Sequence, residues 1–139
     1  MSKRAVAIGL KIPDNTAYTA AVALRRLAVG VERVERSEVW FFDDEGDLPA
    51  LIERIMADET IFNPNKHRVT VLDEPAPRSS EVWIEPLERV TLSQSKGDGE
   101  KAATAWRLFG RNDAAVDRET LRAAVEGLLC NPAIERAVY

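Results

Sequence analysis

One pattern of residues occurs twice along the chain, and it constrains the fold more than any other feature. Residues 37–72 and 104–139 each contain a tryptophan in a strand-like run, a polar turn, a helical stretch, an Asn-Pro pair and a final strand-like run. The tryptophan precedes the asparagine by 23 positions in the first copy and by 25 in the second. These residues are Trp40 and Asn63, then Trp106 and Asn131. Such a repeat predicts two copies of one supersecondary unit.

The first half of the chain alternates between strand and helix periodicity. The predicted elements are, in order, a strand over 4–11, a helix over 16–28, a strand over 31–42, a helix after Asp47 and a strand over 69–72. Asp14 or Asn15, and then Asp47, place side-chain oxygens where the first free amides of each helix need an acceptor. Apolar residues recur at helical spacing in both helices, which predicts one buried stripe on each.

The second half follows the same order in a reduced form. Residues 73–80 are rich in proline and polar side chains and predict a connector. A strand is predicted over 81–87, and a strong apolar stripe predicts a helix over 118–129 behind an Asp117 cap. The polar stretch 93–101 stands in the place of a first helix and predicts a mobile loop.

These elements predict an α+β fold of two strand–helix repeats, with antiparallel sheets and helices on one face. The first repeat covers residues 1–74 and the second covers residues 79–139, as two domains or one integrated domain. Open strand edges promote aggregation, and joining the two sheets removes them. We therefore expect the repeats to pack with pseudo-twofold symmetry.

Composition excludes several classes of function. The chain has 139 residues, a net charge of −4 and an isoelectric point near 5.1, which argues against a general nucleic-acid binder because neutralising phosphates requires a basic surface. No apolar run approaches the roughly 20 residues of a membrane helix, so no membrane association is predicted. The N-terminal apolar run is too short for a secretory signal, and we expect a cytoplasmic protein.

No catalytic residue, metal ligand or cofactor is predicted. His67 is the only histidine and Cys130 the only cysteine, so neither can build an ordinary zinc site. His67 reads as an exposed loop residue, and Cys130 ends an apolar stripe and reads as a buried, inert thiol. Residues 97–102 lack the glycine spacing of a phosphate-binding loop. The acidic run 43–47 lacks the spacing of a calcium loop.

Charged and aromatic side chains provide the candidate partner contacts. Arg25 and Arg26 fall on the solvent side of the predicted first helix. Trp40, Trp83 and Trp106 all lie in strand-like runs, where a tryptophan packs in the core or anchors an interface. Arg25, Arg26 and Trp40 are the predicted partner-binding residues.

The two Asn-Pro pairs are predicted to be structural turns. Asn63-Pro64 and Asn131-Pro132 each stand where a helix must stop and the chain must return to the sheet. Asparagine tolerates the left-handed conformation and forms local hydrogen bonds. We therefore expect positive φ angles at both asparagines, although direct partner contact is the alternative role.

Several segments resemble PurS, the small subunit of phosphoribosylformylglycinamidine synthase. The chain has Ile-Pro-Asp-Asn at 12–15, a helical stretch at 19–27 that ends Ala-Leu-Arg-Arg-Leu, and Gly-Val-Glu-Arg-Val at 30–34. Leu-Leu-Cys-Asn-Pro-Ala-Ile-Glu at 128–135 is similar to the family's Leu-Leu-x-Asn-Pro-x-Ile-Glu, and Ile-Phe-Asn-Pro at 61–64 is a weaker copy.

The resemblance covers residues 4–72 and 104–139 and is poor over 80–103. PurS is usually one such unit, and the loop between its first strand and helix is usually longer. The resemblance therefore implies a tandem form that imitates a PurS dimer. It also implies a non-catalytic subunit that bridges a glutamine amidotransferase and an ATP-dependent synthetase in de novo purine biosynthesis, with self-association as a further possibility.

Two other classes of function stay open at this point. Paired α+β halves often bind small molecules at their seam, so a regulatory, ligand-sensing module is the main alternative. An enzyme of unrecognised type is the third, although no set of catalytic side chains supports it.

Overall fold

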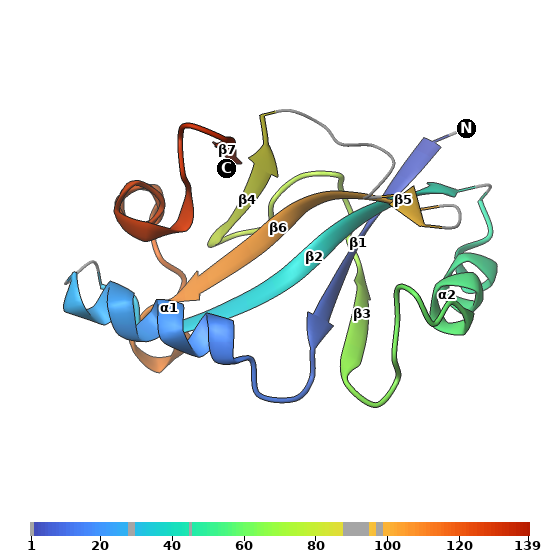
Figure 1. Ribbon diagram of the computed structural model, residues 1–139, viewed down its shortest axis with the longest axis horizontal. Helices are drawn as coiled ribbons and strands as arrows, with labels where there is room; N and C mark the ends of the chain where they lie inside the picture. Colours follow the sequence, from blue (N-terminus) through green and yellow to red (C-terminus); the bar gives the residue numbers. More distant parts are fainter. Residues whose placement is uncertain (1, 28–29, 45, 88–94, 97–98) are drawn as a thin grey trace.

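The computed structural model describes residues 2–27, 30–44, 46–87, 95–96 and 99–139, and shows an α+β arrangement of one antiparallel sheet and its helices (Figure 1). The strands are β1 (Ser2–Leu10), β2 (Arg33–Asp44), β3 (His67–Val71), β4 (Glu81–Pro86), β5 (Ser95–Lys96), β6 (Gly99–Phe109) and β7 (Glu135–Val138). The helical segments are α1 (Asn15–Arg26), α2 (Leu48–Ala57), the 3₁₀ turn η1 (Arg111–Asp113), α4 (Arg118–Ala124) and the π-helical turn η2 (Val125–Leu129).

The sheet runs in the order β3-β1-β2-β6-β4-β7, and β5 pairs with β6 beside this path. Its two ends have the same order, because β1 lies between β2 and β3, and β4 lies between β6 and β7. The long strands β2 and β6 join the two ends, with a register from Arg33 opposite Phe109 to Phe42 opposite Gly99. Both halves of the sequence thus belong to a single sheet.

The tryptophans of the two sequence copies occupy matching places in this sheet. Trp40 on β2 lies opposite Val6 on β1. Trp106 on β6 lies opposite Val82 on β4. In each case a valine of the first strand faces the tryptophan of the second.

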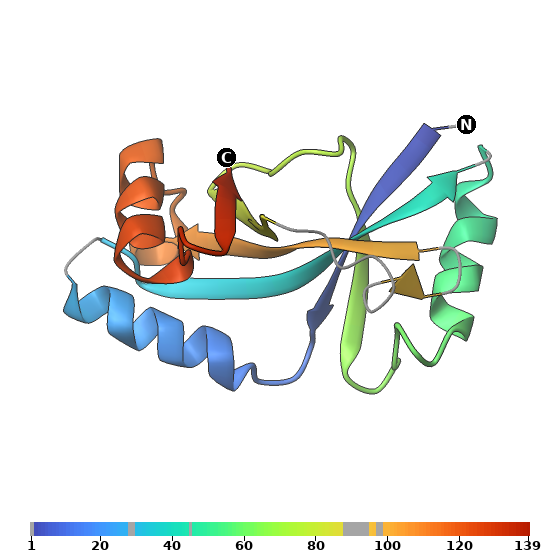
Figure 2. The ribbon, with the colours of Figure 1, turned by 45° about the horizontal axis from the view of Figure 1, so that its top comes forward.

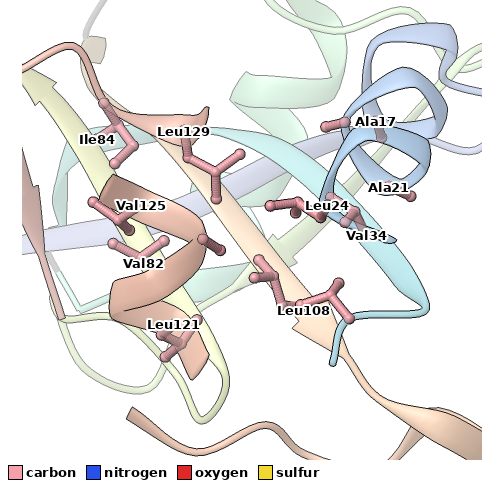
Figure 3. Close-up of a cluster of buried hydrophobic side chains, with 13 residues drawn as sticks. Ala17, Ala21, Leu24, Val34, Val82, Ile84, Leu108, Leu121, Val125 and Leu129 are labelled. Atoms are coloured by element: carbon pink, nitrogen blue, oxygen red, sulfur yellow. The ribbon is translucent and has the colours of Figure 1, made fainter. Parts of the chain in front are cut away.

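The helices pack on one face of the sheet. Alternate side chains of the strands point to that face, and they form two core clusters with the helices. Figure 3 shows the cluster in which α1, α4 and η2 meet β2, β4 and β6. Its largest members are Leu24, Val31, Val34, Val82, Ile84, Leu108, Leu121, Val125 and Leu129. The other cluster packs α2 on β1 and β2, and includes Val6, Ile8, Trp40, Phe42, Leu51 and Ile55.

The opposite face is crossed by the connector between β3 and β4, which Figure 2 shows on the other side of the sheet from α1. Apolar residues, most of them alanines, fill this layer: Ala5, Ala7, Val39, Leu72, Trp83, Ala103 and Ala105. Glu81 anchors the connector, because its buried carboxylate accepts hydrogen bonds from Arg78 Nη2 at 2.8 Å and from Trp83 Nε1 at 3.2 Å. A buried carboxylate requires such partners.

The predicted N-caps are confirmed. Asp14 Oδ1 accepts from the backbone amides of Thr16 and Ala17 at 3.0 and 3.1 Å. Asp47 Oδ1 accepts from Ala50 at 3.1 Å, and Asp117 Oδ1 accepts from Thr120 at 2.7 Å. The hydrogen bonds to Thr120 lower the pKa of the Asp117 carboxyl below its ordinary value. Each cap supplies an acceptor for amides that the helix itself leaves free.

Two predicted boundaries are wrong. The helix α2 ends at Ala57, well before Asn63, because Asp58 turns to an extended conformation and its Oδ1 accepts from the Thr60 amide at 3.0 Å. Part of the predicted loop 93–101 is paired strand, in which Ser95 of β5 lies opposite Glu100 of β6. The rest of that loop lies outside the described residues.

No helix in the described ranges is long and apolar enough to cross a membrane.

Candidate partner-binding surface

A groove of about 440 Å³ lies between α1 and η2. Its floor includes Trp106, a half-buried residue of β6. Small and polar residues of α1 form one wall, and leucines of η2 form the other. The lining residues are Asn15, Thr16, Thr19, Ala20, Ala23, Trp106, Leu128 and Leu129.

Two leucines beside this groove are exposed. Leu128 of η2 is 44% exposed, and Leu27, which follows α1, is 50% exposed. They lie on adjoining segments, because a Cβ atom on Gly127 would stand 3.2 Å from Leu27 Cδ1. We call the groove together with Arg25, Arg26, Leu27 and Leu128 the α1–η2 surface. Exposed apolar side chains gathered in this way are typical of interaction sites.

The two neighbouring leucines of the π-helical turn η2 differ in exposure. The amide of Cys130 donates to the carbonyl of Val125 at 3.2 Å, five residues earlier. Leu129 is only 8% exposed, within the core, while Leu128 faces outward. Such turns are rare and occur often at functional sites. The amphipathic pattern of 118–129 predicts a helix there, and nothing in it indicates the change of helical type.

Arg25 and Arg26 both lie exposed in the last turn of α1. Arg25 Nε is 3.9 Å from Glu32 Oε2, and both side chains are about half exposed or more, at 49% and 59%. Such a pair contributes little to stability in water. Both arginines also lie at the negative end of the helix dipole, which favours a cation there without any partner.

Trp40 does not occupy a position suited to the predicted partner contact. It is 3% exposed, and its ring stacks on Phe42 with centroids 6.3 Å apart beneath α2. The reason is its place beneath α2, because Leu51 and Ile55 of that helix belong to the same buried cluster. Trp83 is equally buried, at 3% exposure. Trp106 is therefore the tryptophan that reaches the groove, although the sequence pattern treats all three alike.

The two Asn-Pro turns contain the same four hydrogen bonds. In the first, Asn63 O accepts from the amides of Lys66 and His67 at 3.0 and 2.8 Å, and Asn63 Oδ1 accepts from Asn65 at 2.9 Å. The fourth bond runs from the Asn63 amide to His67 Nδ1 at 2.9 Å. Pro64 follows within the turn, whose side-chain bond is that of an Asx turn.

In the second turn Asn131 makes the equivalent bonds. Asn131 O accepts from Ile134 and Glu135 at 3.0 and 2.8 Å, and Asn131 Oδ1 accepts from Ala133 at 3.1 Å. Its own amide donates to Glu135 Oε1 at 3.0 Å. Pro132 occupies the place that Pro64 has in the first turn.

The predicted left-handed conformation is wrong at both asparagines. Positive φ angles occur, among the described non-glycine residues, at Ser80, Asn112 and Asp113. The side chains of Asn63 and Asn131 instead accept local hydrogen bonds, so neither residue needs a strained backbone. Asparagine in a turn can adopt the left-handed conformation or accept local hydrogen bonds with its side chain, and its presence alone does not tell which of the two occurs.

His67 and Cys130 also depart from their predicted surroundings. His67 is half-buried, because its ring accepts from Asn63 and lies 6.1 Å from the Phe62 ring. Cys130 is half-buried at the end of η2. Burial, and then the nearby charge of Glu135, raise the pKa of its thiol.

Within the described part of the chain, no group of three histidine, cysteine, aspartate or glutamate side chains is placed to hold a metal ion. The α1–η2 surface presents apolar side chains, an aromatic floor and two arginines at the end of α1. A scan against protein-family models and a search of curated proteins both found no match for this chain.

Proposed function

We propose that this chain is a non-catalytic assembly subunit built from two PurS-like repeats. In this proposal it bridges the glutamine amidotransferase and the ATP-dependent synthetase of a phosphoribosylformylglycinamidine synthase. The two Asn-Pro turns support the repeats, because four equivalent hydrogen bonds recur at each, at the Asn-Pro sites that carry the sequence resemblance. The matching strand order at the two ends of the sheet supports them as well.

The observation that carries the assembly role is the α1–η2 surface. Leu27 and Leu128 expose about half of their side-chain surface although each adjoins the core. Arginine and tryptophan are enriched where partner proteins bind most strongly, and Arg25, Arg26 and Trp106 lie on this surface. A partner helix or loop that covers the groove would remove the exposed leucines from water.

The test compares two surface variants in a reconstituted mixture with both partner subunits. Leu128→Glu changes the groove, and Met56→Glu changes a residue of similar exposure, 49%, on α2. We expect the parent and Met56→Glu to co-elute with at least one partner on size exclusion. Leu128→Glu should weaken that complex about tenfold or more, as loss of a strong interface residue does. Equal binding by both variants would place the contact elsewhere.

A small-molecule sensor is the second candidate, because a cavity of about 240 Å³ opens near the seam of β2 and β6. The charges in its lining are already paired. Arg36 Nε is 3.2 Å from Asp14 Oδ2, and Lys101 Nζ is 3.2 Å from Glu38 Oε2. A ligand would have to displace these pairs, so this cavity supports the sensor less well than the α1–η2 surface supports assembly.

A further inference from the structure

The long strand β2 has a short stretch with a strand partner on one side only. Its pairing with β6 extends to Arg33, whereas its pairing with β1 ends at Ser37, opposite Gly9. Beyond Gly9 the chain bends through 11–14 into α1. Residues 33–36 therefore have no pairing strand on their β1 side within the described part of the chain.

The backbone of Val34 is turned toward this open side. In an antiparallel pair, two opposite residues direct their amides and carbonyls either both toward each other or both away. Val34 lies opposite Leu108, and the Leu108 amide donates to Ser80 on the β4 side, at 2.9 Å. Leu108 thus points away from β2, and Val34 correspondingly points away from β6, toward the open side.

A cavity of about 410 Å³ borders this stretch of edge. Its outer wall is the bend 11–14 and the first turns of α1, and its inner wall is residues 32–36. Two apolar residues of the outer wall are exposed, Ile12 at 46% and Tyr18 at 67%. The cavity thus combines a free strand edge with an apolar wall on the helix side.

In the other half of the sheet, the equivalent edge is paired with a short strand. There β4 pairs with β6 only from Arg107 to Thr104, which leaves the beginning of β6 beyond the end of β4. Strand β5 of the same chain covers that stretch. It runs antiparallel to β6, with Ser95 opposite Glu100 and Lys96 opposite Gly99. The related stretch of β2 lies beyond the end of β1 in the same way, and no described strand covers it.

We propose that this open edge of β2 binds an extended segment of another protein by strand addition. The segment lies antiparallel to residues 33–36, continues the line of β1, and takes the place that β5 takes beside β6. Main-chain hydrogen bonds to Val34 provide affinity, and alternate side chains provide specificity. Those on the helix side are apolar, because they contact Ile12 and Tyr18.

The remaining side chains of the bound segment face a set of charges that is already balanced. Arg33 Nη1 is 2.8 Å from Glu35 Oε2, and Arg68 Nη2 is 3.7 Å from the same oxygen. Arg33 Nε is also 2.8 Å from Asp113 Oδ1. We therefore expect uncharged polar residues at alternate positions, so that apolar and polar residues alternate along the sequence of the bound segment. Residues 33–36 contribute nothing to the α1–η2 surface, although Asn15 and Arg25 border both the cavity and that surface, and the proposal requires neither proposed subunit.

The test uses a displayed library of random linear peptides selected on the purified full chain. Enriched peptides are then measured by calorimetry against the parent, Tyr18→Glu and Met56→Glu. Both substituted residues are exposed on helices, at 67% and 49%, so neither change should unfold the protein. Hydrogen exchange at the Val34 amide, followed by NMR, reports directly on the edge.

We expect enriched peptides of alternating pattern, affinity reduced about tenfold or more by Tyr18→Glu but not by Met56→Glu, and slower exchange of the Val34 amide in the complex. Peptides that bind both variants equally, that leave Val34 exchange unchanged, or that show no enrichment at all would overturn the proposal. The assembly role would survive any of these failures, because its test uses the other surface.

Discussion

At the scale of single residues, the two Asn-Pro turns show different side chains in one role. The amide of Asn63 donates to a histidine nitrogen, and the amide of Asn131 donates to a glutamate oxygen. What the two acceptors share is a lone pair four residues after the asparagine. Sequence comparison finds the Asn-Pro pairs but treats His67 and Glu135 as unrelated, so this part of the turn could not be predicted.

We predict that His67→Glu is tolerated and that His67→Ala is not. Glutamate supplies the same acceptor that Glu135 supplies in the second turn. Alanine leaves the half-buried Asn63 amide without its acceptor, at a cost of about 1–3 kcal/mol in the free energy of unfolding. Urea denaturation of the three proteins measures this difference. Identical stabilities for the alanine and glutamate variants would show that the bond contributes nothing.

The Cys130 thiol should react slowly in the folded protein. Burial and Glu135 raise its pKa, so a smaller fraction is thiolate at neutral pH than in a free cysteine, and the thiolate is the reactive form. Labelling should accelerate in denaturant, and the difference between the folded and unfolded rates should narrow as pH rises through the raised pKa. Labelling at the same rate with and without denaturant would contradict this.

At the scale of elements, local chemistry predicted where helices begin better than where they end. The caps Asp14, Asp47 and Asp117 act on amides two or three residues away, so their effect is visible in the sequence. The end of α2 at Ala57 depends on the turn at Asp58, which comes before the Asn-Pro pair that the prediction took as the helix stop. The amphipathic pattern of 118–129 gives no sign of the π-helical turn at Val125–Leu129.

Gly99 shows a constraint between elements that only the fold reveals. A Cβ atom at this position would overlap the ring of Phe42, which is 3% exposed and cannot move into solvent. We predict that Gly99→Ala lowers the free energy of unfolding by about 1–3 kcal/mol, as overpacking of a core does.

Gly110→Ala is the matched control, since a Cβ atom there meets its nearest neighbour, Gly30 O, at an ordinary 3.6 Å. Thermal or urea unfolding of both variants and the parent measures the change in the free energy of unfolding. An unchanged stability for Gly99→Ala would mean that Phe42 repacks without cost.

At the scale of the whole molecule, the repeated pattern predicted an α+β fold, and the structure has one with an antiparallel sheet. The sequence could not predict which part of the sheet α2 would cover, and so it could not separate Trp40, which lies beneath α2, from Trp106, which lines the groove. The exposure of Arg25 and Arg26 could be predicted, because helical spacing alone puts them on the solvent side. The exposure of the leucines beside them could not be predicted, because it depends on how α1 meets η2.

The central claim is that this chain supplies geometry to two other subunits and performs no chemistry itself. The most direct measurement compares glutamine-dependent and ammonia-dependent turnover by the matching synthetase and amidotransferase, with and without this protein. A bridging subunit brings the ammonia source to its consumer, and an excess of free ammonia makes that proximity partly unnecessary. We predict a large rise in the glutamine-dependent rate, a much smaller change in the ammonia-dependent rate, and a reduced rise with Arg25→Glu/Arg26→Glu. If both rates are indifferent to the protein, the assembly role is wrong.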